Sequence, residues 1–112
     1  MAATKVSPIT IEVSLDENKI PEHIKWSAPD GGVVDEDAKA MLLALWDGDQ
    51  QETLRMDLWV KDMPMDQMQH FFHQTLLTMS DTYQRATGDE KMTGALKDFS
   101  AFFAEQLGLK KH

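Results

Sequence analysis

The chain has 112 residues, 42% of them hydrophobic, and its 19 acidic against 11 basic side chains give a net charge of −8. This length suits one domain, and the hydrophobic fraction excludes a disordered chain. The acidity argues against binding to nucleic acid or insertion at anionic membranes, because phosphate groups would repel the chain. Acidity commonly serves solubility, and the alternative is a face that attracts a basic partner. The residues available for that face are Asp35, Glu36, Asp37, Asp47, Asp49 and Glu52.

Cysteine is absent, and no apolar run approaches the roughly 20 residues that a membrane-spanning helix needs. The absence of cysteine fits a reducing compartment. We therefore expect a soluble, cytoplasmic protein without membrane insertion. We also expect one domain over residues 1–112, with flexible ends at 1–8 and 109–112.

Two segments near the N-terminus alternate between apolar and polar residues. In Ile9–Asp16 the apolar members are Ile9, Ile11, Val13 and Leu15, and His23–Ala28 alternates in the same way. A period of two is typical of a strand with one face in a core. The turn residues of Pro29–Gly32 end the second predicted strand.

The segment Lys39–Trp46 is open to two interpretations. It contains good helix formers, which Asp35 or Asp37 could cap. Leu54–Lys61 alternates beyond a Gly-containing loop, however, and two apolar runs around such a loop favour a β-hairpin. We favour a strand for Lys39–Trp46.

After Val60 the apolar spacing changes to three and four residues. Pro64–Arg85 and Asp89–Leu107 are predicted helices, and Gly88 lies between them. The first apolar stripe comprises Met65, Met68, Phe72, Leu76, Met79 and Tyr83, and we expect it to pack in the core rather than form an adaptable methionine-rich binding surface. Strands followed by helices indicate the α+β class. We predict a four-stranded antiparallel sheet followed by two C-terminal helices packed on one face.

Motifs for catalysis are missing. There is no phosphate-binding glycine loop, no thiol and no serine in the setting of a nucleophile elbow, so we expect no enzyme and no cofactor. Asp66, His70 and His73 share one side of the first predicted helix at spacings that metal sites use. We interpret His70 and His73 as exposed surface residues and expect no metal site.

Trp59 is the most informative candidate. If Met56, Leu58 and Val60 face the helices, Trp59 lies on the opposite side of the sheet with Arg55, Asp57 and Lys61. An aromatic side chain on a polar face is a recurrent anchor of protein interfaces, and the alternative is a ring covered by the stems of Arg55 or Lys61. The sequence therefore offers Arg55, Asp57, Trp59 and Lys61 as a protein-binding site.

Several long strings resemble the gliding-motility protein GldC family. They are Pro21–Ala28, Lys39–Asp47, Asp57–Pro64, Phe71–Leu76 and Arg85–Met92. The resemblance runs over nearly the whole chain and implies a non-enzymatic accessory protein of gliding bacteria, whose partner belongs to the gliding or secretion machinery. It implies no catalytic residue and no cofactor.

A second likeness concerns only the order of the elements. Antiparallel strands followed by two helices also make up the export chaperone SecB, and Ile24–Pro29 is similar to the start of that fold. SecB forms oligomers and binds unfolded export clients, so homo-oligomerisation and client binding are the alternative that this order implies. Fold alone does not determine function.

Overall fold

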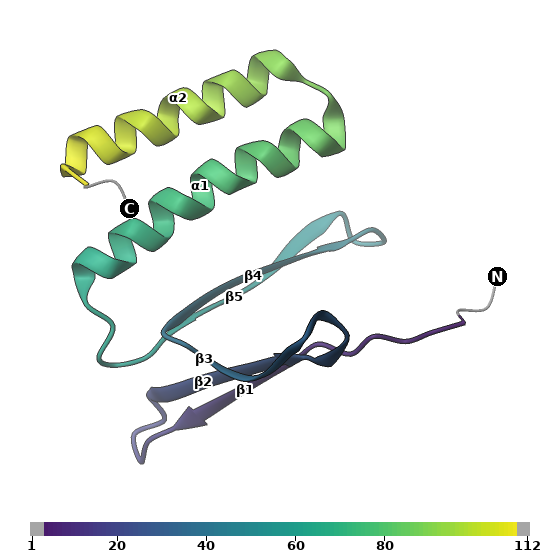
Figure 1. Cartoon of the computed structure of the whole chain (residues 1–112), viewed down its shortest axis with the longest axis vertical. Coiled ribbons are helices and arrows are strands. Elements are labelled where there is room, and N and C mark those ends of the chain that lie inside the picture. Colours follow the sequence, from purple (N-terminus) through teal and green to yellow (C-terminus); the bar gives the residue numbers. More distant parts are fainter. Residues whose placement is uncertain (1–3, 110–112) are drawn as a thin grey trace. The chain divides into compact units, whose positions relative to one another are not determined.

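The computed structural model describes residues 4–109, so the expected flexibility of 1–3 and 110–112 lies outside the described residues. The elements are β1 (Thr10–Leu15), β2 (Pro21–Ala28), a 3-10 turn (Pro29–Gly31), β3 (Val33–Ala38), β4 (Ala40–Asp47), β5 (Glu52–Trp59), α1 (Met65–Thr87) and α2 (Glu90–Leu107) (Figure 1). The α+β class is confirmed. The chain forms two compact units, which divide between Met63 and Pro64. A single domain stays a prediction, as does the packing of the helices on a sheet.

The two N-terminal strands form as predicted. β1 and β2 pair antiparallel, with Ile11 opposite Trp26 and Val13 opposite Ile24. Directly opposed residues point to the same face, so the apolar residues of both strands gather on one side of the sheet. Pro21 begins β2, a strand position that proline tolerates because the first residue need not donate to the ladder.

The prediction of one four-stranded sheet is wrong. The strands form a three-stranded sheet in the order β1-β2-β3 and a separate two-stranded ribbon of β4 and β5. β3 is a further strand that the sequence pattern did not predict, because its acidic run Asp35–Asp37 has no apolar alternation. β3 pairs with β2 at the edge of its sheet, where both faces of such a strand tolerate charge.

The β-hairpin is confirmed, and Lys39–Trp46 is a strand rather than a helix. β4 pairs with β5 from Ala40 opposite Trp59 to Asp47 opposite Glu52. The Asp47 carboxylate accepts backbone hydrogen bonds from Asp49 and Gln50, at 3.0 and 3.2 Å, which stabilises the turn.

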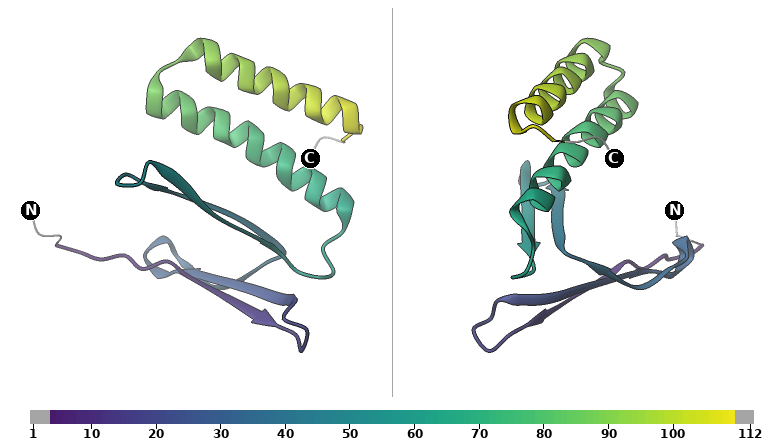
Figure 2. Two further views of the ribbon diagram at one scale, coloured as in Figure 1. Left: turned by 180° about the vertical axis from the view of Figure 1, so that it is seen from behind. Right: turned by 60° about the vertical axis from the view of Figure 1, so that its left-hand side comes forward.

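A sharp bend at Lys39 is the reason for two sheets instead of one. β3 and β4 are separated by this single residue, so one stretch of chain pairs first with β2 and then with β5. The ribbon consequently turns out of the plane of the three-stranded sheet (Figure 2). Two backbone bonds tie β5 into the bend: Val60 N–H donates to the Lys39 carbonyl at 2.9 Å, and Lys61 N–H donates to the Pro21 carbonyl at 3.0 Å.

The core of the strand unit lies beside this bend, which together with Val60 and Lys61 we call the corner. Ile24 and Val60 are each 2% exposed and are the buried hydrophobic residues among those described. Lys61 adds electrostatic links, since its ammonium group lies 3.2 Å from the Asp16 carboxylate and 2.9 Å from that of Glu22. The backbone of Lys61 therefore reaches β2, while its side chain reaches the β1–β2 turn and the start of β2.

These contacts shift two pKa values. The bond to Glu22, followed by the bond to Asp16, raises the pKa of Lys61 above 10.5 against the opposing effect of burial. The Ile20 backbone N–H is the largest influence on Asp16 and lowers its pKa below 3.8, again against burial, and Asn18 and Lys61 act in the same direction as Ile20. The carboxylate of Asp16 accepts these bonds from Asn18 and Ile20 at 2.8 and 3.0 Å.

The two helices form close to their predicted bounds. Asp89 caps α2, because its carboxylate accepts a hydrogen bond from Met92 N–H at 2.9 Å. Gly88 and Gly108 end the two helices with φ values of 72° and 62°, in the left-handed region that glycine adopts without strain.

Small polar residues, rather than the large apolar stripe, are the buried residues of the helical unit. Ser80, Thr93 and Ser100 are 0%, 5% and 1% exposed. Thr93 and Ser100 lie seven residues apart on one side of α2. Asp81, which follows Ser80 on α1, forms an ion pair of 3.4 Å with Lys97 of α2, so Ser80 lies near that side of α2. Their hydroxyls bond back to the helix backbone, so the helices approach closely without unsatisfied polar groups.

Several members of the apolar stripe of α1 are not covered within the helical unit, so their packing in a core stays a prediction. Met65, Phe72 and Met79 are 77%, 42% and 56% exposed. On α2 the corresponding exposed residues are Met92, Phe99 and Phe102. Helical periodicity located these residues on one face, but it could not reveal that small residues make the contact between the helices.

The Lys61 contacts predict how stability depends on pH. The contribution of Asp16 is present above its unfolded pKa of 3.8 and is lost as the pH falls through the lowered folded value. The contribution of Lys61 is present below 10.5 and is lost as the pH rises through the raised folded value. Lys61→Met should lower the urea midpoint at neutral pH and remove this loss of stability at alkaline pH.

Lys25→Met, which replaces an exposed lysine on β2, is the matched control and should leave the pH profile unchanged. If Lys61→Met has the same urea midpoint as the parent at neutral pH and the same decline of that midpoint at alkaline pH, the role given to Lys61 is contradicted.

The close helix contact predicts opposite outcomes for two substitutions at Ser100. Ser100→Leu should lower the free energy of unfolding by about 1–3 kcal/mol, because the larger side chain must push the helices apart. Ser100→Ala should change it by about 1 kcal/mol or less, since the hydroxyl bonds only to the Leu96 carbonyl of its own helix. Urea denaturation followed by helical circular dichroism measures both, and a Leu variant as stable as the parent would refute the close contact.

Candidate protein-binding site

The β4–β5 ribbon has two faces of different chemistry. Its register places the predicted site residues Arg55, Asp57 and Trp59 on one face. The same face, which we call the tryptophan face, comprises Ala40, Leu42, Ala44, Trp46, Thr53, Arg55, Asp57 and Trp59. The opposite face is apolar apart from Asp47 and Glu52 at its hairpin end, and it includes Leu45, Leu54 and Met56, each more than half exposed.

Trp59 lies at the corner end of the tryptophan face. It is 56% exposed, even though the next residue, Val60, is fully buried. A hollow of about 250 Å³ opens beside the indole and is lined by Ile20, Pro21, Asp57, Leu58, Trp59 and Lys61. The side-chain alternation of β5 continues into Val60, which points into the core, while Trp59 lies next to an open hollow.

The charged neighbours of Trp59 are engaged in ion pairs. Arg55 donates two hydrogen bonds to Asp57, at 2.8 and 3.3 Å, in a two-pronged arrangement along β5. Lys61 bonds to Asp16 and Glu22, as described above. The structure therefore gathers Asp57, Trp59 and Lys61 around one hollow, with Arg55 paired to Asp57 further along the strand.

A second tryptophan, which the sequence did not single out, lies on this face. Trp46 is opposite Thr53 and is 64% exposed, and it lies six positions along β4 from Ala40, the partner of Trp59. At about 3.3 Å per residue the two indoles mark a span of about 20 Å. The register between β4 and β5 is what places Trp46 on the same side as Trp59.

Acidic residues adjoin Trp46 at the hairpin end. Asp47 and Glu52 are paired across the last rung of the ribbon, on the face opposite Trp46, and Asp49 lies in the connecting turn. These three residues belong to the acidic set that the sequence offered for attracting a basic partner. The other members, Asp35, Glu36 and Asp37, lie on β3.

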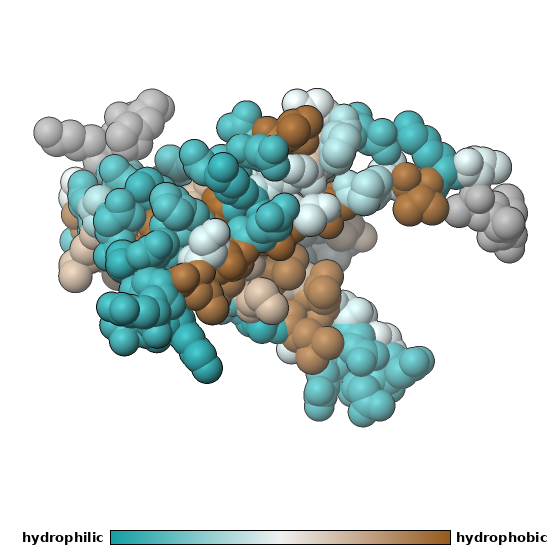
Figure 3. All heavy atoms as spheres, turned by 90° about the horizontal axis from the view of Figure 1, so that it is seen from below, coloured by the Kyte–Doolittle hydropathy of each residue, from teal (hydrophilic) through white to brown (hydrophobic). Residues whose placement is uncertain are grey.

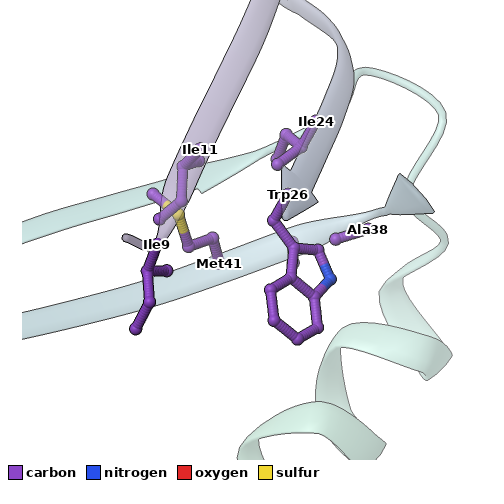
Figure 4. A pocket seen from close by; sticks show the side chains of 7 residues that line it. Ile9, Ile11, Ile24, Trp26, Ala38 and Met41 are labelled. Atoms are coloured by element: carbon purple, nitrogen blue, oxygen red, sulfur yellow. The ribbon is translucent and has the colours of Figure 1, made fainter. Parts of the chain in front are cut away.

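Exposed hydrophobic side chains are a general feature of the chain. Figure 3 shows hydrophobic residues at the molecular surface among polar ones. A second hollow, of about 190 Å³, is wholly lined by apolar residues and lies where β4 meets the three-stranded sheet. It is surrounded by Ile9, which directly precedes β1, by Ile11 of β1, by Ile24 and Trp26 of β2, and by Met41 of β4 (Figure 4).

The histidines of α1 are half-buried and not exposed, which corrects the interpretation made from the sequence. Asp66 is exposed one turn before His70. Within residues 4–109 no three histidine, aspartate or glutamate side chains come together as a possible metal site. The expected absence of a metal site stays a prediction. In the same part of the chain no helix is both long and apolar enough to cross a membrane.

The fold and its surfaces define a class of small α+β protein that presents exposed tryptophans on a two-stranded ribbon. This chain belongs to the GldC-like family, since the family model described as gliding motility-associated protein GldC-like matches residues 21–109. The match confirms the resemblance found in the sequence and includes β2–β5 and both helices. No curated protein and no solved structure matches the chain.

The half-exposed position of Trp59 predicts a modest cost of removing it. A buried Trp→Ala substitution costs about 3–5 kcal/mol, whereas Trp59→Ala should cost about 1–2 kcal/mol and leave the domain folded. Val60→Ala removes far fewer atoms but should cost about 2–3 kcal/mol, because Val60 is 2% exposed. Urea denaturation of both variants provides the measurement, and a loss of 3 kcal/mol or more in Trp59→Ala would make this residue part of the core.

Proposed function

We propose that this protein is a non-enzymatic accessory component of the bacterial gliding-motility machinery and acts by binding another protein through the tryptophan face. Membership of a family described as gliding motility-associated supports the process. The single observation that supports the mode of action is the pair of exposed tryptophans, Trp46 and Trp59, on one face of the β4–β5 ribbon.

Exposed tryptophans suit this role for a physical reason. A tryptophan contributes a large apolar surface with few rotatable bonds, so a partner that covers the ring gains burial at a small cost in side-chain entropy. Such residues are over-represented among those that dominate binding energies. The backbone bonds of the corner hold Trp59 in place before a partner arrives, which reduces the entropy lost on binding.

The charges of the ribbon indicate the chemistry of the partner. Arg55 and Asp57 neutralise each other, so the middle of the tryptophan face carries little net charge. Asp47, Asp49 and Glu52 make the hairpin end of the ribbon negative, with Asp47 and Glu52 on the face opposite Trp46. A partner that fits has an apolar patch for the indoles and basic residues near the hairpin end.

The second candidate is a chaperone-like binder of unfolded export clients. The exposed Leu45, Leu54 and Met56 on the other face of the ribbon favour it, because extended apolar surface can accept many client sequences. The two functions differ in what they capture: an accessory protein retains one defined partner, and a chaperone retains many unrelated chains.

Capture from gliding cells tests the proposal. Purified protein, Trp59→Ala and the double variant Trp46→Ala/Trp59→Ala are used as baits, and the retained proteins are quantified by mass spectrometry. Removing one indole should lower recovery of a defined partner about tenfold or more, as expected for a dominant interface residue. The same variants, introduced into cells, should slow gliding.

Met65→Ala is the matched control, because Met65 is a large apolar residue of α1 that is 77% exposed and lies outside the tryptophan face. Equal recovery with all baits would refute the tryptophan face as the binding site. Recovery of many unrelated chains, lowered by Leu54→Ala and not by Trp59→Ala, would favour the chaperone.

A further inference from the structure

The two edges of the three-stranded sheet differ in how well they are protected against pairing. Within the described part of the chain, β1 and β3 each hydrogen-bond to one neighbour, β2. An edge strand offers unpaired backbone groups to any other strand, and proteins usually block it with charge, proline or a bulge. The edge strands β1 and β3 differ in these features.

The β3 edge is protected in two ways. It carries the consecutive acidic residues Asp35, Glu36 and Asp37, which repel a second acidic chain. The ladder is also irregular between Trp26 and Ala28, and Asp35 adopts a φ of 50° while its N–H donates to the Ser27 hydroxyl at 2.9 Å. Charge and irregular geometry together make this edge a poor template for a further strand.

The β1 edge has little of this protection. Thr10–Leu15 contains neither lysine nor proline, its single charge is Glu12, and its register is regular from Thr10 to Ser14. Its apolar face is also incompletely covered, since Ile9 is 72% and Ile11 38% exposed beside the apolar hollow (Figure 4).

We propose that β1 pairs with β1 of a second copy of this chain, antiparallel and about a two-fold axis at Ile11. This pairing joins the two three-stranded sheets into one sheet of six strands. It is isologous, so it uses the same edge of both copies and closes as a dimer. The protected β3 edges remain at the outside.

The axis at Ile11 follows from the side chains. The apolar residues Ile9, Ile11 and Val13 are symmetric about Ile11, so each copy places Ile9 opposite Val13 on the face that carries the hollow. On the other face Thr10 lies opposite Glu12, and no like charges meet. An axis at Glu12 would oppose the two Glu12 carboxylates, and an axis at Val13 would draw the irregular end near Leu15 into the ladder.

A charge series tests both the edge and the register. Thr10 and Glu12 are exposed, but Glu12 lies opposite Lys25 of β2, so the stability of the Glu12→Lys variant is measured by urea denaturation beside its association. Thr10→Glu places glutamates opposite each other at two symmetric positions and should raise the dimer dissociation constant about three- to tenfold. Thr10→Glu combined with Glu12→Lys creates two opposite-charge pairs and should restore or strengthen the dimer.

Sedimentation over a concentration series measures association, and circular dichroism verifies folding. Gln67→Glu introduces the same charge at an exposed position of α1 and should leave the dissociation constant unchanged. A protein that remains monomeric, a dimer insensitive to Thr10→Glu, or a loss that Glu12→Lys does not reverse would each overturn the proposal. These outcomes do not depend on capture of a motility partner.

Discussion

Two backbone hydrogen bonds at the bend after β3 determine the geometry of the strand unit. Val60 N–H bonds to the Lys39 carbonyl and Lys61 N–H to the Pro21 carbonyl, so the chain directly after β5 is fixed to the β3–β4 bend and to β2. Because these donors leave water on folding, an unmade bond would cost about 1–3 kcal/mol. The orientation of the whole ribbon, and with it the position of Trp59, depends on this junction.

The junction also explains how a buried valine and an exposed tryptophan can be neighbours in the chain. Val60 enters the core beside the bend, whereas Trp59 remains 56% exposed. The side chain of Lys61 then reaches Asp16 and Glu22, which links the β1–β2 turn to the end of the ribbon. A surface on such a support loses little freedom when a partner binds, which is the physical advantage that we assign to the tryptophan face.

The sequence was sufficient for every element with clear periodicity. Alternation identified β1, β2 and β5, and the three- and four-residue spacing identified both helices. It failed for β3, because an edge strand with Asp35, Glu36 and Asp37 needs no apolar alternation. The division into two sheets was also hidden, since the bend at Lys39 arises from long-range pairing with β2 and β5 that no local pattern records.

The candidate site was predictable only where alternation along a single strand determines which side chains share a face. Alternation along β5 places Trp59 on the same side as Arg55 and Asp57, and the structure confirms this arrangement. Trp46 required the register between two strands, and the hollow beside Trp59 required Ile20, which comes from a different part of the chain. On the helices, periodicity located the large apolar residues but not the buried contact at Ser80 and Ser100.

Amide hydrogen exchange at Val60 and Lys61 tests the central claim most directly. If their N–H groups hold the ribbon to the three-stranded sheet, both amides should exchange as slowly as that of Ile24 in the centre of β2, although they follow the last residue of β5. Exchange at the rate of an exposed loop, with Ile24 still protected, would show that the corner is open and that Trp59 is not held in place.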